Sequence, residues 1–130
     1  MSSQPVSVDE LLAEARRGLS RVSPAEAQSA AAGGALLIDI RSDSQRSRDG
    51  DVPGAHPVAR NVLEWRLDPA CPHRDPALAR HDCLVILICD EGYQSSLAAA
   101  TLRRFGLDAT DVVGGFQAWR SAGLPVSAPR

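Results

Sequence analysis

Apolar runs alternate with amphipathic segments along most of the chain. Two of these runs, Ala35 to Ile40 and Leu84 to Ile88, are apolar at consecutive positions, which is typical of strands buried on both faces of a parallel sheet. Thr110 to Val113 has the pattern of a shorter strand, and a weaker strand pattern covers Leu19 to Val22. Because helical segments separate these runs, the pattern predicts an α/β fold with a mainly parallel central sheet.

Helix signals lie between the strand patterns. Ser7-Val-Asp-Glu10 and Ser23-Pro-Ala-Glu26 are capping boxes, in which the serine and glutamate side chains accept hydrogen bonds from backbone N–H groups at a helix start. They predict one helix over residues 7–17 and a second helix that ends at Gly33-Gly34.

Polar, turn-rich stretches connect the remaining elements. Residues 41–57 and 68–82 are predicted to be mostly loop, with a short strand or a helical turn near residues 61–66. Two further helices are predicted over residues 96–105 and 116–122, because each is followed by a glycine suited to end a helix.

Composition and charge exclude several classes of function. The chain has 130 residues and a formal net charge of -2, with arginine supplying every basic side chain. We therefore expect one domain over residues 1–130 that binds neither nucleic acid nor membranes. The N-terminus lacks the pattern of a signal peptide, and three cysteines are an odd number that does not suggest a disulfide framework. A cytoplasmic location, where thiols stay reduced, is expected.

The cysteine that follows the second buried strand is the main candidate for chemistry. Cys89 opens a loop, Cys89-Asp-Glu-Gly-Tyr-Gln-Ser95, that leads from the strand into the next helix. Such a loop directs backbone N–H groups and the positive end of a helix dipole at whatever it holds. This environment favours a thiolate over a thiol, so we expect Cys89 to be a nucleophile.

Four segments match one protein family in their order and spacing. They are Leu37-Ile-Asp-Ile-Arg41, Asp51-Val-Pro-Gly-Ala-His56, the Cys89 loop with its helix, and Asp111-Val-Val-Gly-Gly-Phe-Gln-Ala-Trp119 followed by Gly123-Leu-Pro125. On these segments the chain resembles a single rhodanese-like domain, with a core over about residues 20–126 and the helix 7–17 appended. The resemblance implies a three-layer α/β/α fold.

The resemblance also implies a rhodanese-type sulfurtransferase that needs no cofactor and no metal. Cys89 would accept a sulfane sulfur from a donor such as thiosulfate and hold it as a persulfide. The donor would be a small sulfur-containing anion or another persulfide, and the thiophilic acceptor would be a thiol or a protein. The backbone amides of residues 90 to 95 would form the cradle for the anionic sulfur.

The substrate-binding site is therefore predicted from the loop and from arginines elsewhere in the chain. Its expected members are Asp90, Glu91, Gly92, Tyr93, Gln94, Ser95, Arg41, Arg60 and Arg66. Gly92 would let the backbone curl without a Cβ in the way, and Ser95 or Ser96 would cap the following helix. Tyr93 would wall the pocket and select the donor.

Two residues near the end of the first central strand have structural alternatives. Asp39 is expected to hydrogen-bond loop amides rather than to take part in catalysis. Arg41 either pairs with a carboxylate or faces the pocket, and the sequence leaves both roles open.

The loop departs from the family's pattern in its charge. Many active rhodaneses carry basic residues there, whereas this loop contains Asp90 and Glu91. Two carboxylates beside a sulfur disfavour the thiolate and repel a dianionic donor. We therefore expect modest activity with thiosulfate, and a catalytically weak or silent regulatory or binding module is the alternative function.

Two other activities fit the sequence less well. Phosphatases of this fold place an arginine six positions after the cysteine to clamp phosphate, and Ser95 occupies that position here. A redox sensor at Cys89 would need a resolving thiol, and no second cysteine lies near it in sequence, so the fold would have to bring Cys71 or Cys83 close.

Two short segments contain residue types that bind zinc. Cys71-Pro-His73 and His81-Asp-Cys83 each pair a thiol with an imidazole. The single residue within each pair differs from the usual spacing of zinc sites, and Cys83 precedes a buried strand against which it would pack. No metal site is predicted.

Overall fold

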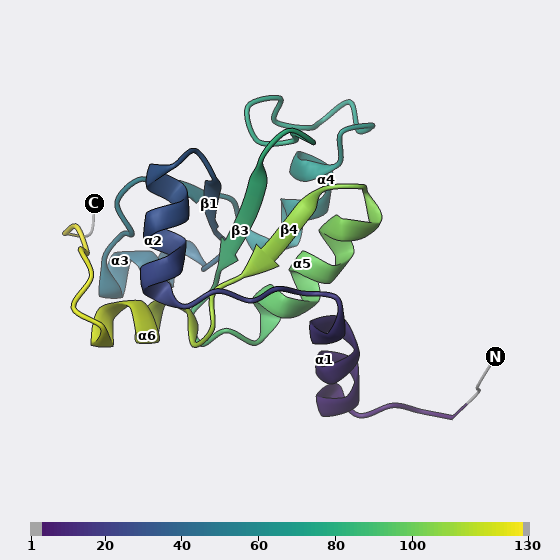
Figure 1. Ribbon diagram of the computed structural model, residues 1–130, viewed down its shortest axis with the longest axis horizontal. Coiled ribbons are helices and arrows are strands. Elements are labelled where there is room, and N and C mark those ends of the chain that lie inside the picture. The colour runs from purple at the N-terminus through teal and green to yellow at the C-terminus, as the bar shows by residue number, and fades with distance from the viewer. Residues whose placement is uncertain (1–3, 129–130) are drawn as a thin grey trace.

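The computed structural model describes residues 4–128 (Figure 1). In chain order the elements are α1 (Val8–Arg17), α2 (Pro24–Ala32), β1 (Leu36–Asp39), α3 (Asp43–Asp49), β2 (His56–Pro57), the 3-10 helix η1 (Arg60–Val62), α4 (Leu63–Leu67), β3 (Leu84–Ile88), α5 (Gln94–Arg104), β4 (Asp108–Asp111) and α6 (Gly115–Ser121). No helix in this range is both long enough and apolar enough to cross a membrane.

The strands form one parallel sheet in the order β2-β1-β3-β4. β1 and β3 lie side by side at its centre, with Asp39 at the end of β1 in register with Ile88 at the end of β3. The weak strand pattern over residues 19–22 corresponds to a single bridge between Val22 and Val112, just beyond β4. Since parallel strands share one carboxyl edge, the loop that follows β3 opens at that edge.

Helices cover both faces of the sheet. Val85 and Leu87 of β3 pack with α4 and α5, whereas Ile86 and Ile88 pack with α2 and α6. Figure 1 shows these two pairs of helices on opposite sides of the central strands. Because successive side chains of a strand point to opposite faces, one apolar run supplies both halves of the core. The predicted three-layer α/β/α fold with a parallel central sheet is confirmed.

The first two helices begin where their capping boxes predict. α1 starts after Ser7 and α2 starts after Ser23, and in both the reciprocal serine and glutamate hydrogen bonds are present. In α2 the glutamate is Glu26, and its hydrogen bonds with Ser23 lower the pKa of its carboxyl group. Because the first N–H groups of a helix have no partner within it, these boxes determine both starting points locally.

Two segments that were predicted as loop, or as either strand or helical turn, contain helices. α3 lies within the expected loop over residues 41–57, and it begins with a third capping box, made by Ser42 and Gln45. The segment near residues 61–66 forms η1 and α4 rather than a strand. Ser42-Asp-Ser-Gln45 follows the capping-box pattern with glutamine in place of glutamate, so the sequence did contain the signal for α3.

α5 begins earlier than predicted. Its first residue is Gln94, and the preceding Tyr93 makes no capping hydrogen bond through its side chain. Ser95 and Ser96 lie inside the first turn, fully buried, and both hydroxyls donate to the Asp111 carboxylate. The prediction that one of these serines caps the helix is therefore wrong, because a buried carboxylate on β4 takes both hydroxyls.

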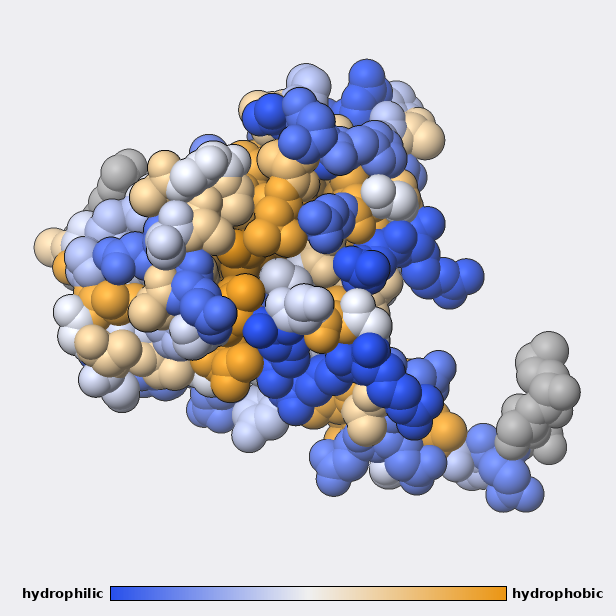
Figure 2. Space-filling model, in the orientation of Figure 1, coloured by the Kyte–Doolittle hydropathy of each residue, from blue (hydrophilic) through white to orange (hydrophobic). Residues whose placement is uncertain are grey.

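α1 lies on the surface of the molecule, against α5 (Figure 1). None of its residues is fully buried, and Val8 and Leu11 remain exposed. Figure 2 shows the most hydrophilic side chains gathered where α1 meets the rest of the molecule. Arg16 of α1 makes polar contacts across this junction, to the Ser96 hydroxyl and to the carbonyl oxygen of Gly92.

Candidate active site

Cys89 follows the last residue of β3 and lies at the carboxyl edge of the sheet. The residue is only 1% exposed, and its Sγ accepts a hydrogen bond from the backbone N–H of Gly92, with 3.2 Å between nitrogen and sulfur. Cys89 also contributes to the wall of an open pocket. Cys89 thus borders a pocket, and a loop amide is directed at its sulfur.

The start of α6 holds the Cys89 loop from behind. The N–H groups of Phe116 and Gln117 donate to the carbonyl oxygens of Cys89 and Asp90, at 2.8 and 3.0 Å. A trans peptide places its C=O and N–H on opposite sides, and the described chain has no cis peptide. The N–H groups that follow these two carbonyls therefore point away from α6.

The close approach of this loop to α6 requires glycine at two positions. Gly92 and Gly115 have φ values of 86° and 59°, in the left-handed region. A Cβ on Gly92 would lie 2.7 Å from the backbone nitrogen of Gly114, and a Cβ on Gly115 would lie 2.5 Å from the carbonyl oxygen of Cys89. Both backbone angle and space exclude larger residues.

Asp111, at the end of β4, lies behind the first turn of α5. Its carboxylate has no exposed surface and accepts the hydroxyl hydrogens of Ser95 and Ser96 at 2.7 and 2.8 Å. Arg21 completes the site, with Nε and Nη2 at 2.9 and 3.2 Å from the two carboxylate oxygens. A buried carboxylate is tolerated when hydrogen bonds and a cation compensate it, and here this compensation ties the start of α5 to β4.

The pocket at Cys89 has a volume of about 290 Å³. Its lining consists of Gln45, Cys89, Asp90, Glu91, Tyr93 and Gln94. Most of the predicted loop residues thus border it, and Gly92 contributes its N–H to the sulfur. Ser95 is turned away, because its hydroxyl donates to Asp111.

Both acidic residues of the loop border this pocket. Asp90 accepts a hydrogen bond from the Gln117 side-chain amide at 2.9 Å, and Glu91 is exposed. Arg48 of α3 lies close enough to be affected: its hydrogen bond with Asp49 raises the pKa of its guanidinium, and the charge of Asp90 adds to that rise. The pocket is therefore bordered by two acidic residues, and Arg48, the cation that Asp90 affects, is already paired with Asp49.

Two of the predicted pocket arginines have other partners. Arg60 pairs with Glu64 at 2.8 Å, and Arg66 donates to the carbonyl oxygen of His73 at 2.9 Å. Neither belongs to the residues that line the pocket at Cys89. The i,i+4 spacing of Arg60 and Glu64 was visible in the sequence, whereas the contact of Arg66 with the His73 carbonyl depends on the path of the loop after α4.

Arg41 makes a buried ion pair. Its Nη2 lies 2.7 Å from Oδ2 of Asp39 and 2.9 Å from the carbonyl oxygen of Gly50, and its guanidinium lies 3.9 Å from the ring centroid of Phe116. Of the two roles that the sequence left open for Arg41, the structure shows the pairing with a carboxylate and not a position in the pocket at Cys89. Asp39 also accepts the backbone N–H of Arg41 at 3.0 Å, which confirms its expected structural hydrogen bond.

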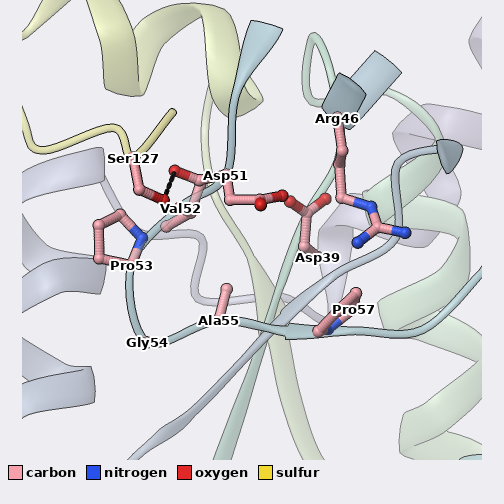
Figure 3. Close-up of a pocket in the computed structure, with 9 residues that line it drawn as sticks. All are labelled: Asp39, Arg46, Asp51, Val52, Pro53, Gly54, Ala55, Pro57 and Ser127. Atoms are coloured by element: carbon pink, nitrogen blue, oxygen red, sulfur yellow. Dashed lines mark hydrogen bonds between the residues drawn. The ribbon is translucent and has the colours of Figure 1, made fainter. Parts of the chain in front are cut away.

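A second cavity, of about 190 Å³, lies beside Asp39 (Figure 3). Figure 3 shows the carboxylates of Asp39 and Asp51 pointing toward one another, with the guanidinium of Arg46 next to Asp39. Neither Cys89 nor any residue of its loop lines this cavity. It is separate from the site predicted around the sulfur.

The cysteines and histidines of the two candidate zinc segments do not converge on a metal site in the part of the chain that the structure describes. Within residues 4–128, His, Cys, Asp and Glu side chains form no group of three or more that could hold a metal ion. Cys71 accepts the backbone N–H of His73 at 3.4 Å, and His81 Nδ1 lies 3.2 Å from the carbonyl oxygen of Gly106. Cys71, Cys83 and Cys89 are all free thiols.

Comparison with known proteins identifies the family. The sequence model described as the rhodanese-like domain matches residues 23–122, a range that includes the sheet and the Cys89 loop. The chain belongs to the rhodanese-like family. No curated protein matches it at a significant level.

Solved structures share this rhodanese-like fold. A protein of unknown function from Rhodopseudomonas palustris, named a possible tyrosine phosphatase, is 31% identical over 97% of this chain and 98% of its own, with a TM-score of 0.86. A rhodanese-related protein from Thermoplasma volcanium is 22% identical over 82% of this chain and 95% of its own, with a TM-score of 0.67. The thiosulfate sulfurtransferase from Pseudomonas aeruginosa is 21% identical, with a TM-score of 0.67, over 85% of this chain but only 20% of its own. The two more distant likenesses show the fold alone.

Sequence reasoning missed the residues that reach this rhodanese-like site from other elements. Gln45 and Arg48 lie on α3, which was predicted as loop, and Gln117 lies on α6. The capping box of α3 could have placed the first two on a helix. Their approach to the Cys89 loop has no local signal, because it depends on how α3 and α6 pack at the edge of the sheet.

Replacing Gly92 or Gly115 with alanine is expected to reduce the free energy of unfolding by more than about 1 kcal/mol, the rough cost of a left-handed backbone alone. The additional loss comes from the contacts of the new Cβ with backbone atoms. Gly123→Ala is the matched control, since its φ is 74° and nothing lies within 4 Å of its Cβ. Urea unfolding followed by circular dichroism measures each loss, and equal losses at the three positions would contradict this account.

Replacing Arg41 with methionine is expected to cost about 3–5 kcal/mol of stability, because the Asp39 carboxylate then stays buried without its cation. The double variant Asp39→Asn/Arg41→Met removes both charges, so we expect it to be less destabilised than the sum of the two single variants. Urea unfolding of the four proteins closes the cycle. Additive losses would show that the pair is not coupled.

Proposed function

We propose that this protein is a rhodanese-type sulfurtransferase in which Cys89 carries the transferred sulfur. The observation that carries the proposal is the hydrogen bond from the Gly92 N–H to the sulfur of Cys89, a residue that borders a pocket. A backbone donor already directed at the sulfur stabilises negative charge there without rearrangement. The membership of the rhodanese-like family supports the same chemistry.

The proposed reaction has two nucleophilic displacements at sulfur. The Cys89 thiolate attacks the outer sulfur of thiosulfate, a new S–S bond forms, and sulfite leaves with the electron pair of the broken bond. An acceptor thiolate then attacks the outer sulfur of the Cys89 persulfide and receives it, while the Cys89 thiolate leaves. The protein supplies the nucleophile and the amide donors, and each step ends with the enzyme's charge unchanged.

The acidic mouth of the pocket bears on the class of substrate. Asp90 and Glu91 both border it, and they repel a dianion such as thiosulfate more than a singly charged persulfide. We therefore propose that the physiological donor is a persulfide, carried by a small thiol or by a protein, and that thiosulfate is a weak donor. The pocket volume of about 290 Å³ suits a small donor group, and is too small for several side chains of a folded partner at once.

A binding module without catalysis is the second candidate function. Cys89 is only 1% exposed, and a buried cysteine reacts more slowly than an accessible one. In this function the loop amides would hold an anion or a partner peptide, and no sulfur would be transferred.

Phosphatase activity is not proposed, although the Rhodopseudomonas palustris protein is named a possible tyrosine phosphatase. A phosphate clamp would need a cation at the position of Ser95, six residues after Cys89. Ser95 is fully buried here, and its hydroxyl is engaged by Asp111.

Incubation with thiosulfate or with glutathione persulfide is expected to add one sulfur atom to Cys89. Intact-protein mass spectrometry, followed by peptide mapping, detects the addition. Cys89→Ser is expected to lose it completely, and the control Cys83→Ser is expected to retain it. If no sulfane donor adds sulfur to the wild-type protein, the binding module is the better account.

Replacing Glu91 with glutamine is expected to raise kcat/KM for thiosulfate by about twofold to fivefold at low ionic strength, because one repulsive charge leaves the pocket mouth. The gain should shrink as salt is added, since salt screens the exposed carboxylate. Glu14→Gln, which removes an equal charge from the exposed side of α1, is the control. A steady-state assay with cyanide as acceptor measures both variants, and identical values for them would exclude the electrostatic effect.

A further inference from the structure

Two arginines that precede the family match converge on the Cys89 loop. Arg16 lies in the last turn of α1 and Arg21 in the segment after it, whereas the match begins at residue 23. Their Nη2 atoms both donate to the carbonyl oxygen of Gly92, at 2.8 and 3.0 Å. Gly92 is also the residue whose N–H donates to the Cys89 sulfur. A single loop residue therefore links the sulfur to two cations.

The two arginines differ in how their charges are balanced. Arg21 forms a bidentate ion pair with Asp111. Arg16 instead donates through Nε to the Ser96 hydroxyl at 3.0 Å, and within the described part of the chain its hydrogen bonds reach no carboxylate. The positive charge of Arg16 is thus left without an ion-pair partner, directly behind the loop.

Arg16 also contacts the loop at a third point. Its guanidinium carbon lies 5.9 Å from the ring centroid of Tyr93, the residue that precedes α5 and borders the pocket. Its hydrogen bonds to Gly92 and Ser96 are partly buried, so water and salt weaken them less than contacts at an open surface. One side chain from α1 therefore contacts Gly92 in the loop, Tyr93 just before α5, and Ser96 in the first turn of α5.

We propose that Arg16 is a positioning residue for Cys89. It fixes Gly92 so that the Gly92 N–H stays directed at the sulfur, and its charge favours the thiolate in a loop whose own charged residues are acidic. The inference rests on the proposed role of Cys89 as a nucleophile. Among the described residues, the other charged groups near the loop are Asp90 and Glu91 within it, the pair of Arg48 with Asp49 on α3, and the pair of Arg21 with Asp111 on β4.

A simpler role for Arg16 would be to anchor α1 to α5. That role predicts a loss of thermal stability when Arg16 is changed but no change in the chemistry of the sulfur. The midpoint of the pH profile of Cys89 alkylation separates the two roles, because a change in access alters the rate at every pH, whereas a change in ionisation moves the midpoint.

Arg16→Met keeps the aliphatic stem and removes the charge and its donors. We expect the midpoint of the pH profile of Cys89 alkylation by iodoacetamide to rise by about one unit, so that alkylation below the midpoint slows about tenfold. Arg17→Met removes the same charge from the exposed neighbour on α1 and should leave the profile unchanged. Peptide-resolved mass spectrometry distinguishes Cys89 from Cys71 and Cys83.

Arg16→Lys retains the charge and should restore most of the wild-type profile. If Arg16→Met alkylates Cys89 with the same profile as Arg17→Met, or if Arg16→Lys shifts the profile as far as Arg16→Met, the proposal is wrong. Should Arg16→Met fail to fold, Arg16→Gln, which keeps a hydrogen-bond donor without the charge, decides in the same way.

Alkylation needs no sulfur donor, so this test is independent of sulfur transfer. A wild-type protein that takes up no sulfane sulfur, yet whose alkylation profile depends on Arg16, would contradict the proposed sulfurtransferase and leave the positioning role intact. If the wild-type protein forms the persulfide but Arg16→Met leaves the alkylation profile unchanged, the sulfurtransferase proposal is supported and the positioning role of Arg16 is contradicted.

Discussion

The candidate active site of this molecule depends on one buried carboxylate. Asp111 has no exposed surface, so its charge has to be compensated within the protein, and Arg21, Ser95 and Ser96 together provide that compensation. The requirement joins the end of β4, the first turn of α5 and the segment before α2. It also explains why α5 starts at Gln94 with no side-chain cap, since the serines nearest its start are engaged by Asp111. The position of the loop between β3 and α5 follows from this arrangement.

The groups in the loop that favour an anion at Cys89 are backbone N–H groups and not side chains. The first N–H groups of α6 occupy the carbonyl oxygens of Cys89 and Asp90, and Gly92 turns its own N–H to the sulfur. Peptide dipoles oriented in this way favour an anion even where the nearby side chains are acidic. A site built on these terms can stabilise a persulfide while its carboxylates discourage dianions from entering. This combination is the physical basis for proposing a sulfurtransferase that uses thiosulfate poorly.

The site extends beyond the residues by which the family is recognised. α1 precedes the family match, yet Arg16 from its last turn reaches Gly92, Ser96 and the ring of Tyr93. The alignment with the Rhodopseudomonas palustris protein covers 97% of this chain, so it has to include α1 as well. In this chain, the N-terminal helix therefore contacts the Cys89 loop as well as the surface of α5.

The sequence alone determined those features that depend on neighbours a few residues apart. The capping boxes at Ser7 and Ser23, the two apolar runs of the central strands and the loop opened by Cys89 are all where short-range pattern predicts them. Only the tertiary structure decided which side chains surround the sulfur: Ser95 donates its hydroxyl hydrogen to Asp111 instead of facing the pocket, and Gln45 of α3 borders the pocket. Such contacts join residues that are distant along the chain, and they follow from the packing of whole helices on the sheet, which leaves no mark in any short stretch of sequence.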